Sequence, residues 1–334
     1  AYPGDERKAI VRGAGIVSRG NSNLVVYGFK IEHTPEHAIR IQGPNAKNIA
    51  VVNNHTYDTW KSGISIRGVS GNADPGNYDN IRDVLVYGNL VELGTNGGGG
   101  EIISVGSGAV NVDVAYNEVR VGDPNFEGGD EGISFKEGVR DSRIYGNVIH
   151  DLSDKGIHID GGSSVHDPLI TNIELVGHVV VDLPSQVMWV TTEGRGDVDG
   201  VYVHHNIVHN VAGDGFLVYR HPDGAAAGGT VKNVWFDHNT VWRGGQRGGG
   251  FGGFRVNHPT ATGIAFTNNI AWANGGYDMR GEPGTNFAHN LCQEGWLCEE
   301  TDRPLFRSPP ANFELRPESP AVGAGYGGSD LGAE

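Results

Sequence analysis

The chain has 334 residues, 54 of them glycine, and a formal net charge of −15 at pH 7. Nucleic-acid phosphates are bound by clustered Lys and Arg, so this acidic composition argues against a general nucleic-acid binder, though not against a local site for an anionic ligand. No apolar run reaches the roughly 18 residues that span a bilayer, and no signal peptide stands at the first residue, so we expect a soluble chain without a membrane partner.

Short strands joined by tight turns are favoured by the many glycines and by a hydrophobic content of only 37% without a long helical pattern. An internal repeat of roughly thirty residues organises these strands, because an Asn follows a strand-like run in each copy. The repeated residues are Asn54, Asn89, Asn117, Asn147, Asn206, Asn239 and Asn269, with a degenerate copy at His178. Asn tolerates a left-handed backbone and its amide can bond the equivalent amide one coil away, so we expect a stack of Asn at one bend.

A second repeat consists of short segments in which apolar and polar residues alternate. These segments are His37–Gln42, Ser62–Arg67, Glu101–Gly106, Glu131–Lys136, Lys155–Asp160, Gln186–Thr191, Asp214–Tyr219 and Gly252–Asn257. Period-two alternation places one apolar pair of each segment inside, for example Ile133 with Phe135 and Ile157 with Ile159, and the intervening residues outside. Such segments, repeated without helical patterns between them, predict parallel strands stacked in a solenoid rather than βαβ units.

The two repeats predict an all-β fold, a single parallel β-helix of about eight to ten coils within residues 1–334. The pattern resembles the right-handed parallel β-helix of the pectate-lyase-like superfamily, over roughly residues 23–292. Residues 293–334 resemble the closing segment of many secreted bacterial β-helix proteins, and we expect this segment to cover the last coil because an open sheet edge invites aggregation. The resemblance implies a secreted or periplasmic protein, and we expect a monomer.

Two cysteines, Cys292 and Cys298, stand at the beginning of this closing segment. Their spacing suits a small disulfide, which an extracellular protein would retain, and two free thiols are the alternative.

Charged residues gather on the outer face of the central segments. If neighbouring segments stack in register, Glu131, Lys136, His158 and Asp160 lie on one solvent-facing surface, because adjacent strands are about 4.8 Å apart. Glu101 and Glu131 then stand one coil apart in the same column. Two carboxylates that close together need a cation or a proton between them.

Two interpretations of this acid pair stay open. A hard, oxygen-ligated ion such as Ca²⁺ suits Glu101 and Glu131, with Asp130 and Asp154 as further candidate ligands. An acid ladder that is hydrogen-bonded or paired with Lys155 explains the same pattern without a metal.

The segment Glu131-x-Ile133-Ser134-x-Lys136 resembles the motif of the polysaccharide lyase family six alginate lyases. In that family the Glu two residues ahead of Ile-Ser binds calcium and the Lys is the Brønsted base, which implies these roles for Glu131 and Lys136. Glu101 takes the position of a calcium ligand from the preceding coil. The catalytic Arg of the family is not matched, because Asp160 stands in its column, and this departure leaves the acid and the substrate unassigned.

β-Elimination in a uronic-acid polymer needs a neutralised carboxylate, a base and an acid. Calcium would supply the first, Lys136 is the candidate base with a pKa lowered by a metal or by Lys155, and His158 has the natural pKa of an acid. Asp160 is a third candidate catalytic residue. The predicted function is therefore a lyase acting on an acidic polysaccharide. Candidate sugar-binding residues along the groove are Arg67, Lys155, Trp189, Tyr219, Arg220, His221 and Arg255.

Two other functions use the same surface. A glycoside hydrolase needs two carboxylates about 5 to 10 Å apart, and Glu131, Asp154, Asp160 and Asp214 offer several pairs. The Asn-Thr-Asp, Asp-Asp and Gly-His-Gly motifs of polygalacturonases are absent. A non-catalytic carbohydrate-binding β-helix is the third candidate, because a fold does not determine a function.

Overall fold

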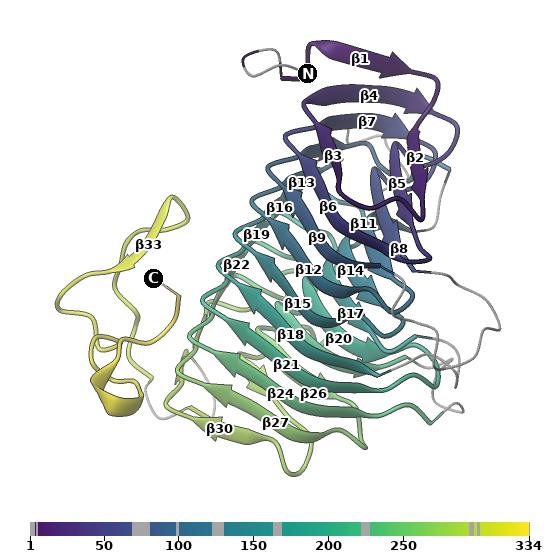
Figure 1. Cartoon of the computed structure of the whole chain (residues 1–334). Coiled ribbons are helices and arrows are strands. Elements are labelled where there is room, and N and C mark those ends of the chain that lie inside the picture. The colour runs from purple at the N-terminus through teal and green to yellow at the C-terminus, as the bar shows by residue number, and fades with distance from the viewer. Residues whose placement is uncertain are drawn as a thin grey trace.

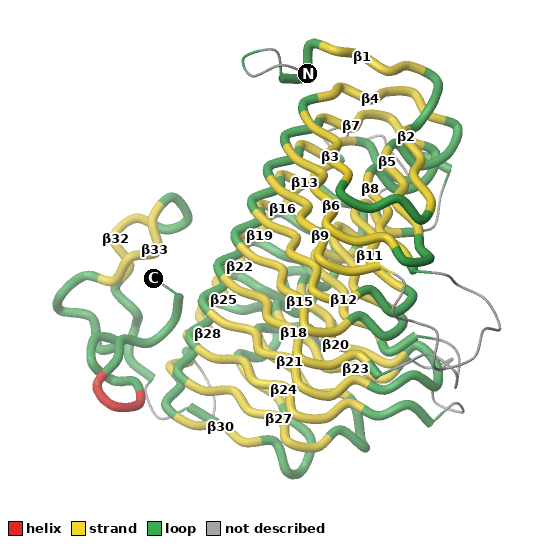
Figure 2. The backbone as a smooth tube through the Cα atoms, in the orientation of Figure 1, coloured by secondary structure: helices red, strands yellow, loops and turns green. Residues whose placement is uncertain are grey.

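The computed structural model describes residues 4, 6–68, 81–97, 100–121, 130–162, 169–221, 228–293, 297–298 and 301–333. Three parallel sheets wind into one elongated coil (Figure 1, Figure 2). The described residues include one short 3-10 helix, η2 (Tyr326–Gly328), and none of their helices is long and apolar enough to cross a bilayer. The predicted all-β parallel β-helix is confirmed.

Sheet A contains β1 (Ala9–Arg12), β4 (Phe29–Thr34), β7 (His55–Thr59), β10 (Leu90–Glu92), β13 (Glu118–Arg120), β16 (Val148–His150), β19 (Val179–Val181), β22 (Ile207–His209), β25 (Thr240–Trp242), β28 (Ile270–Trp272) and β31 (Leu291–Cys292). Sheet B contains β2 (Ile16–Arg19), β5 (Ile39–Gln42), β8 (Ile64–Arg67), β11 (Glu101–Gly106), β14 (Glu131–Lys136), β17 (Lys155–Asp160), β20 (Met188–Thr192), β23 (Phe216–Arg220), β26 (Phe254–Asn257) and β29 (Met279–Arg280). Sheet C contains β3 (Leu24–Tyr27), β6 (Ala46–Val52), β9 (Ile81–Tyr87), β12 (Val110–Ala115), β15 (Arg140–Tyr145), β18 (Ile170–Val176), β21 (Val198–His204), β24 (Val231–Asp237), β27 (Thr262–Thr267) and β30 (Asn286–Ala288). A separate antiparallel pair, β32 (Phe306–Ser308) and β33 (Asn312–Leu315), lies in the C-terminal segment.

Each full coil adds one strand to sheet B, then to sheet C, then to sheet A. Strands three apart in the chain therefore pair in parallel, as β11 does with β14 and β14 with β17. The eight alternating segments of the sequence correspond to β5, β8, β11, β14, β17, β20, β23 and β26. Crossovers between parallel strands are right-handed in nearly all proteins, in agreement with the predicted hand of the coil.

The interior of the coil is apolar because the sheet B strands alternate as predicted. Ile133 and Phe135 of β14 are fully buried, and so are their counterparts Ile157 and Ile159 of β17. Each coil buries this apolar side only against its neighbours, so the stack as a whole holds any one coil in place. The intervening side chains of sheet B are thereby fixed on its outer side, where the candidate site lies.

The predicted Asn stack is present at the bend between sheets C and A. Its buried members are Asn54, Asn89, Asn117, Asn147, His178, Asn206, Asn239, Asn269 and Asn290. The amide of Asn117 donates to Asn147 Oδ1 at 2.9 Å and to the Val86 carbonyl at 3.0 Å, while its oxygen accepts from the Asn89 backbone at 2.9 Å. Asn290 extends this buried ladder by one position that the sequence analysis did not include.

The left-handed residue of the bend is the one before each ladder residue, not the ladder Asn itself, which corrects our expectation. The backbone φ is positive at Asn53, Gly88, Tyr116, Gly146, Gly177, His205, His238, Asn268 and His289. Asn is therefore used in the ladder for its amide rather than for its backbone. At Gly146 glycine meets two demands, because φ is 61° and a Cβ would lie 2.6 Å from the Tyr116 ring.

A second, exposed ladder crosses the sheet C strands and was not predicted. It is made by residues with positive φ, namely Asn48, Asp83, Asn111, Asp141, Asn172 and Asn233. Their side chains bond from coil to coil, since Asn111 Nδ2 donates to Asp83 Oδ1 at 2.7 Å and Asn172 Nδ2 donates to Asp141 Oδ1 at 2.8 Å. Asn and Asp are the side chains that most readily accept this backbone conformation.

The C-terminal segment, residues 301–333, packs beside the coil (Figure 1). We expected it over the last coil, but it lies mainly along the outer face of β22, β25 and β28. A separate hydrophobic cluster joins the two parts and contains Ile270, Leu291, Phe306, Phe313, Ala321 and Leu331, with Ile207, Trp242 and Trp272 packed against it. The reason is that these sheet A strands carry apolar residues on their outer face, which the segment covers.

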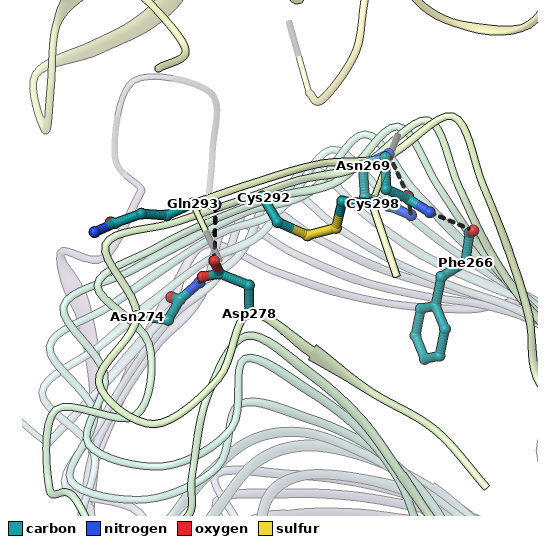
Figure 3. The surroundings of a disulfide bond; sticks show 8 residues. Phe266, Asn269, Asn274, Asp278, Cys292, Gln293 and Cys298 are labelled. Atoms are coloured by element: carbon teal, nitrogen blue, oxygen red, sulfur yellow. Dashed lines mark hydrogen bonds between the residues drawn. A yellow bond between two sulfur atoms is a disulfide. The ribbon is translucent and has the colours of Figure 1, made fainter. Parts of the chain in front are cut away.

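Cys292 and Cys298 form the small disulfide that their spacing suggested (Figure 3). Beside it, Asp278 accepts hydrogen bonds from the Gln293 backbone at 2.8 Å and from Asn274 Nδ2 at 2.7 Å. These contacts fasten the end of the last coil, from which the chain continues into the C-terminal segment.

Candidate functional site on sheet B

The central strands of sheet B hold the candidate residues in the register that we expected. Glu101 of β11 lies opposite Glu131 of β14, which in turn lies opposite Lys155 of β17. Lys136 lies opposite Asp160 in the same pair of strands. Three successive coils therefore bring these side chains onto one side of the sheet.

Lys136 is the centre of a charged cluster. Its Nζ atom lies 3.0 Å from Glu101 Oε1 and 3.1 Å from Glu131 Oε2. A third carboxylate, that of Glu193, is 4.0 Å away. The position between Glu101 and Glu131, where the sequence required a cation or a proton, thus holds an ammonium group of the chain itself.

Glu131 is also contacted from its other sides. The Ser134 hydroxyl donates a hydrogen bond to it, Lys155 Nζ lies 3.3 Å from Oε1, and His158 Nδ1 lies 2.8 Å from the same oxygen. Glu131 of β14 is therefore held to β17 by its contacts with Lys155 and His158.

Glu193 belongs to the cluster and was missed by the sequence analysis. It follows β20, and its backbone N–H donates to Asp160 Oδ1 at 2.9 Å. This bond turns the side chain back toward the cluster, where Oε1 lies 3.9 Å from His158 Nε2. Its side chain is 32% exposed and so more open than the other carboxylates around the ammonium. If the alternating segment Gln186–Thr191 had been extended by one more step of two residues, it would have included Glu193.

His158 and Asp160 are buried, whereas we expected them on a solvent-facing surface. The exposed fractions are 0% for His158 and 2% for Asp160. The Trp189 ring meets the His158 ring edge-on at 5.8 Å, and Lys155 Nζ lies 4.8 Å from the centre of the Trp189 ring. Long neighbouring side chains thus cover the shorter ones, and His158 contacts the cluster from beneath rather than from the solvent.

The environment keeps Lys136 charged, which corrects the expected lowering of its pKa. Burial lowers the pKa of Lys136, but the carboxylates of Glu131 and Glu101 outweigh burial and raise it well above its usual range. Lys155, which we expected to act on Lys136, contacts Glu131 instead. An ammonium held in this way is a poor base at neutral pH.

The acids of the cluster differ in charge. Burial raises the pKa of Glu131, but His158, Lys136 and Lys155 outweigh burial and hold this pKa far below its usual range. For Asp160, burial is the largest influence and the pKa is raised. Glu131 is therefore firmly ionised, while Asp160 takes up a proton more readily than a solvated carboxyl.

The residues predicted to bind calcium do not converge on one position. Asp130 accepts a hydrogen bond from the Gly100 backbone at 3.2 Å, and Asp154 pairs with Lys155 at 3.1 Å. Lys136 lies between the carboxylates of Glu101 and Glu131. This arrangement does not fit Ca²⁺, which takes six to eight oxygen ligands.

Another set of possible metal ligands consists of Glu131, His158 and Glu193, one ligand atom of each lying within 4.8 Å of the others. Lys136 approaches both carboxylates of this set as well. A metal ion here would have to compete with the ammonium group for the same oxygens.

The predicted sugar-binding residues divide into those beside the cluster and those away from it. Lys155, Trp189 and Tyr219 adjoin it, and the rings of Trp189 and Tyr219 are 5.4 Å apart on neighbouring coils. Arg67 lies at the end of β8, where it bonds the Glu137 carboxylate.

Arg220, His221 and Arg255 lie further along the stack, at β23 and β26. The His221 ring is 6.2 Å from the Tyr219 ring, and Arg255 Nη1 is 3.7 Å from Asp214 Oδ2. Asp214 is fully buried and also accepts from the Tyr277 hydroxyl. The outer side of sheet B thus carries an aromatic and basic track that continues beyond the charged cluster.

No protein-family model matches the chain, and no curated protein matches it. Among solved structures it matches the Dettilon tailspike protein at 14% sequence identity and a TM-score of 0.39, over 81% of this chain and 61% of that chain. A match of this quality says nothing about residues or activity, and the fold rests on the strand pairing itself.

Proposed function

We propose that the outer side of sheet B binds an acidic, uronic-acid-containing polysaccharide and cleaves it by β-elimination. The observation that carries the proposal is the Lys136 ammonium, held among three carboxylates of which one, Glu193, is partly open. The aromatic pair Trp189 and Tyr219 beside it would support sugar rings. The resemblance of residues 131–136 to the lyase motif points to the same reaction class.

In this proposal Lys136 acts through its charge. A uronate carboxylate placed against the ammonium would become a better electron sink, so the C5 proton would become more acidic. This role differs from that of a base, which the raised pKa of Lys136 disfavours.

Glu193 is then the candidate base, because its carboxylate is the most open one in the cluster. It would take the C5 proton, the C5–H electron pair would form the C4–C5 double bond, and the C4–O bond would break. Lys155, whose ammonium lies over Trp189 on the sugar-binding side, would give its proton to the leaving oxygen. His158, buried against Glu131 and Glu193, is a positioning residue for the two carboxylates.

The main alternative is a glycoside hydrolase. It is favoured by one observation, since Glu131 and Glu193 place carboxylate oxygens within 4.8 Å of each other, near the separation of about 5 Å found in retaining enzymes. A sugar-binding protein without activity would use the same track.

One experiment separates the three functions. The protein is incubated with alginate, pectate, glycosaminoglycans and neutral glycans, while the ultraviolet absorbance of the C4–C5 double bond and the release of reducing ends are both followed. A lyase produces both signals, a hydrolase only reducing ends, and a binder neither while retaining affinity for the glycan.

Lys136 and Glu193 have different roles in this proposal, one through its charge and one as the base. Lys136→Ala and Glu193→Gln should each lower turnover about a hundredfold or more, whereas Lys136→Arg should retain part of the activity because it keeps the charge. Lys232→Ala, which removes an exposed lysine on sheet C, is the matched control. If Lys136→Arg is as inactive as Lys136→Ala while both bind the glycan normally, Lys136 is a base and this assignment is wrong.

A further inference from the structure

A cavity lies between sheet A and the C-terminal segment, away from the charged cluster on sheet B. Its volume is about 410 Å³, which is within the range of small-ligand sites. Its lining includes Trp242, Arg243, Trp272, Arg303, Arg307 and Arg316. None of these residues takes part in the function proposed for sheet B.

The lining is strongly basic in a chain whose net charge is −15. It includes four arginines and no acidic residue. Arg307 pairs with Glu314 at 3.1 Å, and Arg316 donates to the Arg307 carbonyl at 3.3 Å. Within the described part of the chain, Arg243 and Arg303 have no carboxylate at ion-pair distance. Guanidinium groups gathered in this way suit a carboxylate, which a planar fork can bind through two hydrogen bonds.

The same cavity has an aromatic wall. Trp242 and Trp272 lie opposite each other on neighbouring strands, and the Arg243 guanidinium lies 4.2 Å from the centre of the Trp242 ring. The two indoles are fixed because their strands belong to the coil and their outer side is packed by the C-terminal segment. Because Arg243 covers a face of Trp242, Trp272 is the indole that would accept the apolar face of a sugar ring.

We propose that this cavity is a separate binding site for an acidic oligosaccharide, with carboxylates on the arginines and a sugar ring face on Trp272. A volume of about 410 Å³ accommodates a few sugar units rather than a long chain. A polyphosphate would pair with the arginines but would leave the aromatic wall of the cavity without a role. The site does not depend on cleavage at sheet B.

The test uses the full chain with Lys136→Ala, so that no turnover disturbs binding. Calorimetric titration with a uronic-acid trisaccharide from alginate or from pectate should show binding at sheet B and, separately, at the cavity. Adding Arg243→Gln and Arg303→Gln together should weaken the binding at the cavity about tenfold or more, because two charge-assisted contacts are lost, and should leave the binding at sheet B unchanged. Arg82→Gln, an exposed arginine on sheet C, should leave the binding at both sites unchanged.

Several results would overturn the proposal. These are equal affinity for the double variant and its control, equal affinity for a neutral trisaccharide, or binding of inorganic sulfate or of a triglutamate peptide as tight as that of the uronate. Melting temperatures of all variants are compared to show that they fold. Lyase activity in the otherwise unaltered chain is assayed separately, so loss of the cavity site and failure of the sheet B proposal give different outcomes.

Discussion

His178 shows how one residue can substitute chemically for another in a buried ladder. Its Nδ1 accepts from the Asn147 backbone at 3.1 Å, Nε2–H donates to the Ile144 carbonyl at 3.0 Å, and its own backbone N–H donates to Asn206 Oδ1 at 3.0 Å. This pattern requires a neutral ring, because a protonated Nδ1 would face another donor. Burial lowers the pKa of His178 to about 4.

We predict that His178→Asn makes the protein less sensitive to acid. In the unfolded chain the imidazole takes up a proton near pH 6.5, whereas in the folded chain it does so only near 4. Stability is therefore complete above pH 6.5 and falls as the pH drops toward 4, by about 3 kcal/mol in total. Urea unfolding between pH 8 and 4 measures the difference between the two proteins. If the free energy of unfolding depends on pH in the same way in the wild type and the variant, this prediction is wrong.

Calcium binding also depends on a single residue, because the ammonium group of Lys136 occupies the position that the ion would take. With Lys136 between Glu101 and Glu131, we predict that chelation leaves the melting temperature and the activity unchanged. Lys136→Ala vacates the position, and calorimetric titration should then detect calcium binding that the wild type lacks. Calcium binding by the wild type that Glu131→Gln weakens would restore the original calcium prediction.

At the scale of the elements, the buried ladder is a stabilising device whose loss should be costly. Asn117→Ala would leave the Asn89 backbone N–H and amide and the Val86 carbonyl without their partner. Each buried unsatisfied group costs about 1 to 3 kcal/mol, so we predict a loss of about 2 to 5 kcal/mol in the free energy of unfolding. Chemical denaturation checks this value. Asn111→Ala, in the exposed ladder, should cost less than about 1 kcal/mol, and equal losses at both sites would contradict the argument.

The elements also show which features a sequence can reveal. Sheet B could be predicted because an apolar residue at every second position leaves a direct pattern, as with Ile133 and Phe135 of β14 and Ile157 and Ile159 of β17. The exposed ladder could not, because residues such as Asn111 and Asp141 look like ordinary turn residues when they stand within a strand. Glu193 was missed because it lies just past a strand, and the burial of His158 depends on long side chains from other coils. The charge state of Lys136 likewise follows from distances that spacing does not contain.

For the whole molecule, two separate hydrophobic clusters predict two levels of stability. One fills the coil and the other joins the coil to the C-terminal segment. Phe313 belongs to the second, with its ring 5.4 Å from His209, 5.9 Å from Trp242 and 5.2 Å from Phe306. We predict that Phe313→Ala costs about 3 to 5 kcal/mol locally.

Limited proteolysis should then cut the C-terminal segment of Phe313→Ala much faster than that of the wild type, while the β-sheet circular dichroism of the coil persists. Phe216→Ala, inside the coil, is the comparison. It should lower the main unfolding transition itself. Loss of both parts together in Phe313→Ala would show that the clusters are not independent.

Because the bend between sheets C and A is the same in each coil, one whole coil can be removed or added without disturbing the bend. Removing residues 90–117 would join Asn89 to Glu118, and Glu118 is the residue that already lies opposite Leu90 in the next strand. Asn89 would then meet Asn147 as it now meets Asn117, and the ladder would continue without a break. Duplication or loss of one such unit in the gene changes the length of the protein and needs no new kind of connection between coils. Natural variation among proteins of this design can therefore adjust the length of the sheet B track, and with it the number of sugars in contact, by whole coils.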